Sequence, residues 1–150
     1  MRTRLCCCAA ALLFVAQPCF GQIAPDRTLS AKVHRQDSAR ADRIEVRSIP
    51  DGARIWSAST APLSVENIVW TPDSQFLVWS GANAGGHQPW HHPVHAWSRK
   101  TRQILVLEAY LPGPVDEPSL KVAPPAKLTV SVQDHIATEL DLSKLNGRRP

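Results

Sequence analysis

From residue 43 onward, the sequence alternates apolar and polar residues with a period of two, and turn-forming residues interrupt the alternation at short intervals. Arg43-Ile44-Glu45-Val46-Arg47 is a clear example. This is the period of a β-strand with one buried face, and no long stretch has a helical period. The sequence therefore predicts an all-β fold, a small antiparallel meander of about eight short strands. The expected strands cover residues 43–47, 53–57, 67–70, 75–80, 93–98, 103–107, 128–132 and 136–142.

The turns between these segments have a physical cause. Pro50-Asp51-Gly52 combines a fixed φ with a glycine that accepts a positive φ, so we expect a hairpin over residues 43–57. Thr71-Pro72-Asp73-Ser74 separates two apolar runs in the same way, with Asp73 expected as an Asx-turn residue. Residues 111–126 are rich in proline, which excludes them from the centre of a sheet.

The first 21 residues have the pattern of a secretory signal peptide. Arg2 and Arg4 give a positive start, and an apolar run over residues 5–16 follows. The run is too short to span a bilayer core of about 30 Å. Small residues precede an expected cut before Gln22. We therefore predict a secreted or periplasmic protein with no membrane span after cleavage.

The rest of the chain divides by composition. Residues 22–42 are polar without a sustained period, which predicts a linker or a disordered arm. Residues 43–145 are long enough for a single β domain, and residues 146–150 form a short tail.

Cleavage would remove all the cysteines of the chain, because the four of them lie before Gln22. The remaining protein could be neither a thiol enzyme nor a zinc-thiolate protein. Loss of Arg2 and Arg4 also lowers the net charge from +4 to +2. The longest basic cluster lies at residues 99–102, where it is more typical of a turn, so we expect no nucleic-acid partner.

The segment Ile68-Val69-Trp70-Thr71-Pro72-Asp73-Ser74-Gln75-Phe76-Leu77-Val78-Trp79-Ser80 resembles one blade of the WD40-like β-propellers of the TolB and dipeptidyl-peptidase type. In those blades Ser-Pro-Asp-Gly joins two hydrophobic strands; here Thr71 and Ser74 stand in the serine and glycine positions. The resemblance implies one blade over residues 67–107, flanked by strand pairs. No second copy of the motif follows at a fixed period, so a closed propeller is not expected.

The least generic stretch is a histidine-rich loop over residues 85–95. In a protein without thiolates, imidazole is the natural ligand for zinc or copper. Extended backbone places neighbouring side chains on opposite sides, which groups His87, His91 and His95 as a candidate metal site. The same spacing turns His92 away. An alternative interpretation gives these histidines structural roles, such as capping backbone groups or stacking on tryptophan.

The same loop is the expected contact surface, with Trp90, Gln88 and His92 as its binding candidates. Trp70 and Trp79 are expected in the core. The sequence carries no motif of a known catalytic site, so we predict a non-catalytic domain with a binding or structural role toward a protein or an envelope component. A metal-binding protein or metal-dependent enzyme is one alternative, and a carbohydrate-binding module with Trp90 as its platform is another.

Overall fold

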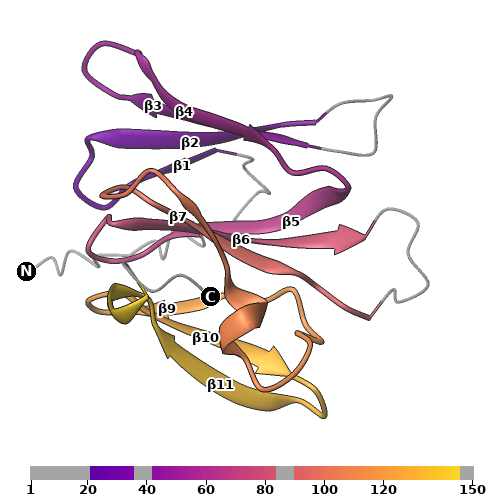
Figure 1. Ribbon diagram of the computed structural model, residues 1–150. Helices are drawn as coiled ribbons and strands as arrows, with labels where there is room; N and C mark the ends of the chain where they lie inside the picture. Colours follow the sequence, from indigo (N-terminus) through magenta and orange to yellow (C-terminus); the bar gives the residue numbers. More distant parts are fainter. Residues whose placement is uncertain (1–20, 36–41, 84–89, 146–150) are drawn as a thin grey trace, which may run out of the picture.

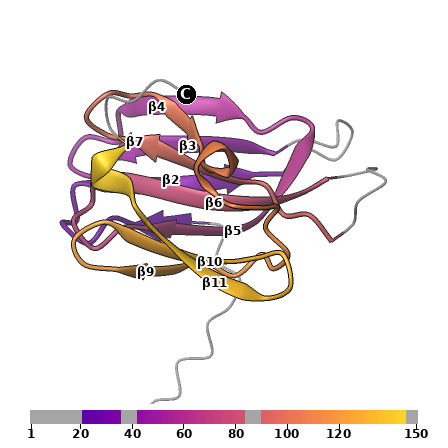
Figure 2. The same ribbon diagram turned by 60° about the horizontal axis from the view of Figure 1, so that its bottom comes forward.

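The computed structural model describes residues 21–35, 42–83 and 90–145, and these form three antiparallel sheets stacked as layers (Figure 1). The first sheet has the order β1-β2-β3-β4, the central sheet β5-β6-β7-β8 and the third sheet β11-β10-β9. The all-β prediction is confirmed, and the described residues form no closed barrel or propeller. A second view, turned by 60°, shows the same layers with β9–β11 brought forward (Figure 2).

Within each four-stranded sheet, neighbouring strands are also consecutive in sequence. The first sheet consists of β1 (Gly21–Ile23), β2 (Leu29–His34), β3 (Arg43–Ser48) and β4 (Arg54–Ser59). The central sheet consists of β5 (Leu63–Trp70), β6 (Phe76–Asn83), β7 (Val94–Ser98) and β8 (Ile104–Val106). This serial antiparallel order is the order of strands in a propeller blade.

The third sheet is smaller and follows an extended excursion. The 3₁₀ segment η1 (Leu107–Tyr110) leaves β8, and the chain then crosses to β9 (Lys121–Ala123), β10 (Lys127–Val132) and β11 (Ile136–Asp141). A second 3₁₀ segment, η2 (Leu142–Lys144), follows β11. Strand β9 comes from the proline-rich region and lies at the sheet edge, where proline-flanked strands are tolerated.

Two apolar layers hold the stack together, one on each face of the central sheet. On β6, Leu77 and Trp79 face the first sheet, whereas Phe76 and Val78 face the third. Consecutive residues of one strand are thus buried on opposite sides, as in a strand covered on both faces. The predicted burial of Trp70 and Trp79 is confirmed, since each is 3% exposed.

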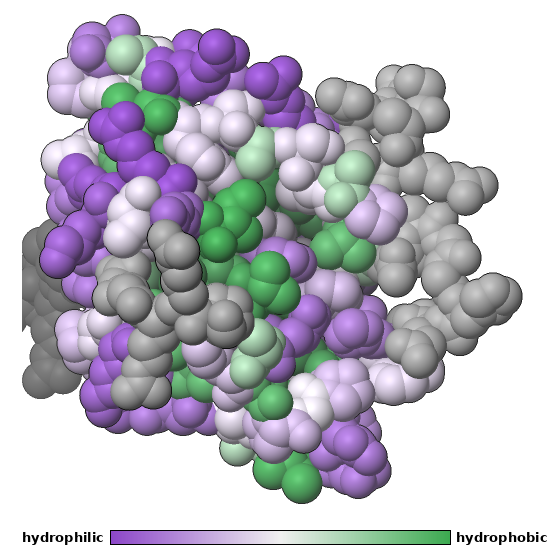
Figure 3. All heavy atoms as spheres, viewed as in Figure 1, coloured by the Kyte–Doolittle hydropathy of each residue, from purple (hydrophilic) through white to green (hydrophobic). Residues whose placement is uncertain are grey.

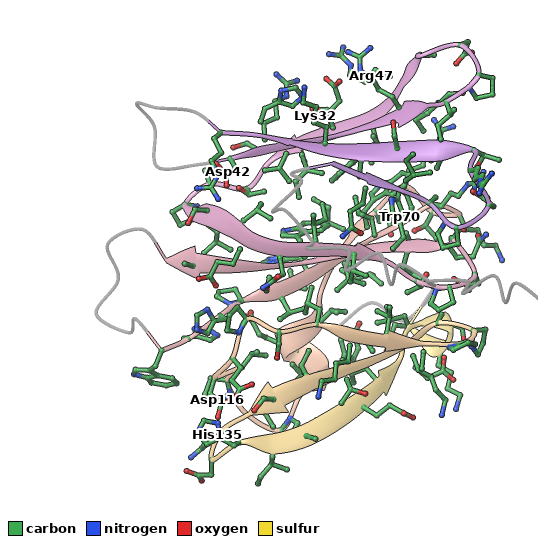
Figure 4. All side chains as sticks on the ribbon, turned by 180° about the vertical axis from the view of Figure 1, so that it is seen from behind. Lys32, Asp42, Arg47, Trp70, Asp116 and His135 are labelled. Atoms are coloured by element: carbon green, nitrogen blue, oxygen red, sulfur yellow. The ribbon has the colours of Figure 1, made fainter. Side chains whose placement is uncertain are left out.

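Tryptophan rings fill most of the space between the first and central sheets. Trp56 of β4 stacks on Trp97 of β7 with ring centroids 5.2 Å apart, and Trp70 meets Trp97 edge-on at 6.2 Å. Figure 4 shows Trp70 between these two sheets, while Lys32 and Arg47 project from the outer face of the first sheet. Aromatic pairs of this kind add to the stability gained from burial.

The turn that carries the propeller resemblance is built as the sequence predicts. Asp73 Oδ1 accepts hydrogen bonds from Thr71 Oγ1 at 2.6 Å and from the Gln75 backbone N–H at 3.0 Å, which is an Asx-turn. Ser74 has a φ of 60°, the conformation that glycine would adopt most easily. Its hydroxyl accepts a hydrogen bond from the Asp26 backbone N–H at 3.0 Å, linking the turn to the β1–β2 connection.

The prediction of a linker or disordered arm over residues 22–42 is wrong for most of that segment. β2 pairs with β3 over six residues, and Leu29, Ala31 and Val33 are buried against the central sheet. The period of two was present here, but small and charged residues made it weak. Residues 36–41, and the predicted tail at 146–150, lie outside the described residues.

The two strand pairs that the sequence predicted beside the single blade are parts of larger sheets in the structure. β1 and β2 extend the 43–57 hairpin into a four-stranded sheet, and β9 adds a third strand to the β10–β11 hairpin. Buried Asp42 links the first two sheets, because its Oδ2 accepts a hydrogen bond from the Val65 backbone N–H at 2.7 Å. The described residues thus form three antiparallel sheets, where the sequence predicted one blade with flanking strand pairs.

We expect the stability of the interface between the first and central sheets to depend most on Trp97. Its side chain is fully buried, and its indole nitrogen has no hydrogen-bond partner in the described part of the chain. Trp97→Ala should lower the free energy of unfolding by about 3–5 kcal/mol, because it opens a large cavity. Trp97→Phe should cost less, since it keeps a ring and removes an unpaired N–H.

Urea unfolding followed by circular dichroism measures both effects. Trp90→Ala is the matched control, because Trp90 is 49% exposed and its loss should change stability by no more than about 0.5 kcal/mol. Equal losses for the Trp97→Ala and Trp90→Ala variants would contradict this assignment.

Candidate binding site at the edge of the central sheet

The described part of the histidine-rich loop is held by carboxylates. His92 Nδ1 lies 2.5 Å from Glu66 Oε2, and the His92 backbone N–H donates to the Val115 carbonyl at 2.9 Å. Only 13% of the His92 side chain is exposed. His92 therefore anchors the loop to β5 and to the excursion after η1, and it does not present the open ring expected of a contact residue.

His91 has a similar arrangement on the other side of the loop. Its Nε2 lies 3.3 Å from Glu108 Oε1, at the start of η1. Both side chains are largely buried, and the geometry of this close pair is not that of a hydrogen bond. The pair nevertheless places opposite charges together whenever His91 is protonated.

His95 lies in β7 and packs as an aromatic side chain. Its ring is stacked on Trp79, with centroids 5.6 Å apart and an interplanar angle of 10°. Nδ1 is buried and has no hydrogen-bond partner among the described residues. Burial lowers the pKa of His95, and the nearby charge of Glu108 offsets part of that effect.

The predicted metal-binding residues are placed only in part. Among the described residues, no group of three or more histidine, cysteine, aspartate or glutamate side chains could hold a metal ion. His87 and Gln88 lie outside those residues, so the site formed by His87, His91 and His95 stays a prediction. What the structure adds is that His91 faces Glu108 while His95 is stacked on Trp79.

Trp90 is the most exposed tryptophan among the described residues. The residue is 49% exposed, and its ring lies 6.2 Å from the His91 ring in a tilted arrangement. An exposed indole on a loop whose neighbours are anchored is available for contact with a ligand.

A cavity of about 320 Å³ opens between the first and central sheets, beside their last strands. It is lined by the stacked pair of Trp79 and His95, by Ile104 and Val106 of β8, and by the connection from β4 to β5. We call this surface the edge patch: Ser59, Thr60, Ala61, Pro62, Leu63, Trp79, His95, Ile104 and Val106.

The edge patch exposes apolar side chains that ordinary folding would bury. Ile104 is 41% exposed and Val106 is 49% exposed, and both face the first sheet because they pair with Trp97 and His95. Figure 3 shows hydrophobic residues gathered near the middle of one face, with hydrophilic residues around them. The orange segment that carries β8 crosses the same face in Figure 1.

Sequence reasoning missed the edge patch. The signal was present in the strand expected at 103–107, which has apolar residues at both parities although it ends a sheet. Such a run indicates a strand buried on both faces. Only the sheet order shows that β8 is an edge strand, so that Leu105 packs inward while Ile104 and Val106 stay accessible.

No known protein family matches the sequence, and no curated protein matches it either. Among solved structures, the hydrazine synthase of Kuenenia stuttgartiensis is similar over 85% of this chain and 40% of its own, with a TM-score of 0.59 and 15% sequence identity. Two others are the β-propeller domain of the trilobed protease of Pyrococcus furiosus and an uncharacterized protein of Listeria monocytogenes. The Pyrococcus domain has a TM-score of 0.47 and 12% sequence identity, and the match covers 80% of this chain and 42% of that one. The Listeria protein has a TM-score of 0.49 and 15% sequence identity, and the match covers 81% of this chain and 39% of that one.

The chain therefore spans about 40% of the length of these structures. At such low identity the likeness concerns the all-β fold alone. Among the described residues there is no helix that is long and apolar enough to cross a bilayer.

The pKa of His95 makes the stability of the protein depend on pH. Because burial lowers the folded pKa below the ordinary value of 6.5, the unfolded chain binds more protons in the window just below that pH. Stability is therefore lost as the pH falls through the folded pKa. His95→Phe keeps a ring against Trp79 and removes this titration, so the variant should gain stability relative to the wild type as the pH falls.

Urea unfolding of both proteins between about pH 8 and pH 5 measures the difference. Its slope should be at most about 1.4 kcal/mol per pH unit, the limit for a single proton. Parallel pH profiles would show that His95 does not titrate differently in the folded protein.

Proposed function

We propose that this protein is an exported, propeller-like domain that binds a partner without catalysing a reaction, and that the edge patch is its contact surface. The observation that carries the proposal is the cavity lined by the Trp79–His95 pair and the exposed side chains of Ile104 and Val106. A concave, mostly apolar site with a few polar groups at its rim is the usual form of a binding pocket. Exposed apolar patches of this kind mark interaction surfaces.

The roles of the loop histidines support binding over catalysis. His92 is held by its contact with Glu66, His91 lies near Glu108, and His95 lines the cavity. A general base would need a ring nitrogen directed at an open site, whereas the Nδ1 of His95 is buried and its ring is stacked on Trp79.

The partner is a protein or an envelope component, because the signal-like first 21 residues direct the chain to the secretory route. The exposed ring of Trp90 favours one second candidate, a carbohydrate ligand stacked on the indole. The two candidates use different side chains, so single substitutions separate them.

Nile red, a neutral apolar dye, tests the edge patch. The folded full-length protein should bind it saturably with about one site per chain. Val106→Asp should weaken binding at least tenfold, because a carboxylate would have to lose water beside the dye. Ile136→Asp is the matched control, since Ile136 is 60% exposed on the third sheet, and it should leave affinity unchanged.

Trp90→Ala should also leave dye binding unchanged, although it would abolish binding to a carbohydrate platform. Absence of saturable binding to folded protein, or an equal loss in the Ile136→Asp variant, would refute the edge patch as the contact surface.

Export is tested separately by expressing the full chain in a bacterial host and sequencing the N-terminus of the exported product. We expect it to begin at Gln22, whose carbonyl already accepts a hydrogen bond from Trp70 Nε1 at 3.3 Å in the fold. Retention of the chain inside the cell with Met1 intact would contradict the signal-peptide prediction.

A further inference from the structure

We propose that the edge patch receives an extended apolar segment of a partner protein, which pairs with β8 as a fifth strand of the central sheet and places a carboxylate beside the basic turn before β8. This inference rests on the proposed function and specifies the partner. Three features of the described residues lead to it: an uncovered strand edge, the spacing of two apolar side chains, and the charges at the ends of β8.

The backbone of β8 supplies the first feature. β8 pairs with β7 through Ile104, Leu105 and Val106, and the order of the central sheet ends there. An edge strand presents N–H and C=O groups on its outer side, and another extended chain is the partner that satisfies them in series. A rounded small molecule could fill the cavity, but it could not satisfy this row of groups.

The side chains supply the second feature. Ile104 and Val106 are two residues apart and lie on the same face, so their Cα atoms are about 7 Å apart along the strand. A strand added beside β8 has the same repeat, and its alternate side chains would contact Ile104, Val106 and the cavity next to them. The partner should therefore carry apolar residues at every second position.

The composition of β8 fits an edge meant to be paired. Proteins usually protect exposed edges with charged residues or proline. Among the longer edge strands, β4 begins with Arg54, β5 carries Glu66, and β11 carries Glu139 and Asp141, whereas the three-residue edge strands β1 and β8 have neither a charge nor a proline. β8 is Ile-Leu-Val, with neither a charge nor a proline, and two of its three side chains are more than 40% exposed.

The charged residues at the two ends of β8 indicate the strand direction of the partner segment and the charge that it should carry at its C-terminal end. Lys100 and Arg102 are exposed in the turn before β8, whereas Arg99 is already paired with Asp26 at 2.6 Å. Glu108 lies beyond the other end, opposite His91. A segment antiparallel to β8 would place its C-terminal end beside Lys100 and Arg102, so a terminal carboxylate or a late acidic residue is the complementary group.

A fluorescein-labelled peptide of sequence Thr-Val-Thr-Val-Thr-Val-Asp, with a free C-terminal carboxylate, tests the proposal by fluorescence anisotropy with the full-length protein. We expect saturable binding with a Kd below about 100 μM. A second peptide, N-methylated at alternate residues, keeps the apolar side chains but cannot complete a ladder, and it should bind at least tenfold more weakly. A third, ending in Lys with an amidated C-terminus, should also bind more weakly.

Protein variants show where the peptide binds. Val106→Asp should reduce affinity at least tenfold, and Ile136→Asp should change it less than twofold. Arg102→Glu should weaken binding of the acidic peptide and strengthen binding of the lysine peptide, a reversal that misfolding could not produce. Circular dichroism and the urea midpoint confirm that each variant is folded.

Several outcomes would overturn the proposal. No binding at 1 mM peptide, or equal binding of the N-methylated peptide, would show that no strand is added. Nile red binding without peptide binding would leave the proposed function standing and reject this partner, whereas loss of both would reject the two together. Dimers in analytical ultracentrifugation that Val106→Asp abolishes would identify a second copy of the chain as the occupant of the edge and reject a separate partner.

Discussion

The structure depends on the burial of the central sheet from both sides. β5–β8 carries one apolar set toward the first sheet and another toward the third, so neither outer sheet could be removed without exposing a full face of the centre. The first of these contacts includes four tryptophans, with Trp56 against Trp79 and Trp97, and Trp70 against Trp97. Aromatic rings bury large areas, which suits a domain whose described residues contain no cysteine for cross-linking.

The outer faces of the stack have a different character. On the first sheet, Lys32, Arg43 and Arg47 alternate with the buried residues of β2 and β3. On the third, Lys127 pairs with Glu139 at 2.8 Å across two strands. These faces carry charged residues, although Ile23 and Ile136 are exposed there; Ile104 and Val106 are exposed together along the edge of the central sheet. The edge patch is therefore a consequence of how the first two sheets are stacked, since β4 leaves β8 partly uncovered.

The histidine-rich loop and the edge patch meet at the same end of the molecule. Glu108 contacts His91 and also influences His95, so the loop, η1 and the cavity share one set of charges. The contact between His92 and Glu66 fixes the approach of the chain to β7, and β7 in turn positions His95 on Trp79. The histidines thereby contribute to the shape of the site, whereas the apolar side chains of β8 provide its contact area.

The sequence by itself determined the secondary structure class, most strands and the chemistry of the turns, because these depend on local periodicity and on residues such as Asp73 and Ser74 that act within a few positions. It also determined that Trp70 and Trp79 would be buried, since large apolar residues in strands have few other places to go. It did not determine that β2 pairs with β3. The apolar residues Leu29, Ala31 and Val33 include small side chains and alternate with polar and charged ones, and their burial depends on a partner sheet that is distant in sequence. Nor could the sequence distinguish Ile104 and Val106 from core residues, because an apolar strand has the same sequence pattern at the centre of a sheet and at its edge. The tertiary structure decided that point, because exposure is fixed by which strands and sheets stand beside β8 and not by β8 itself.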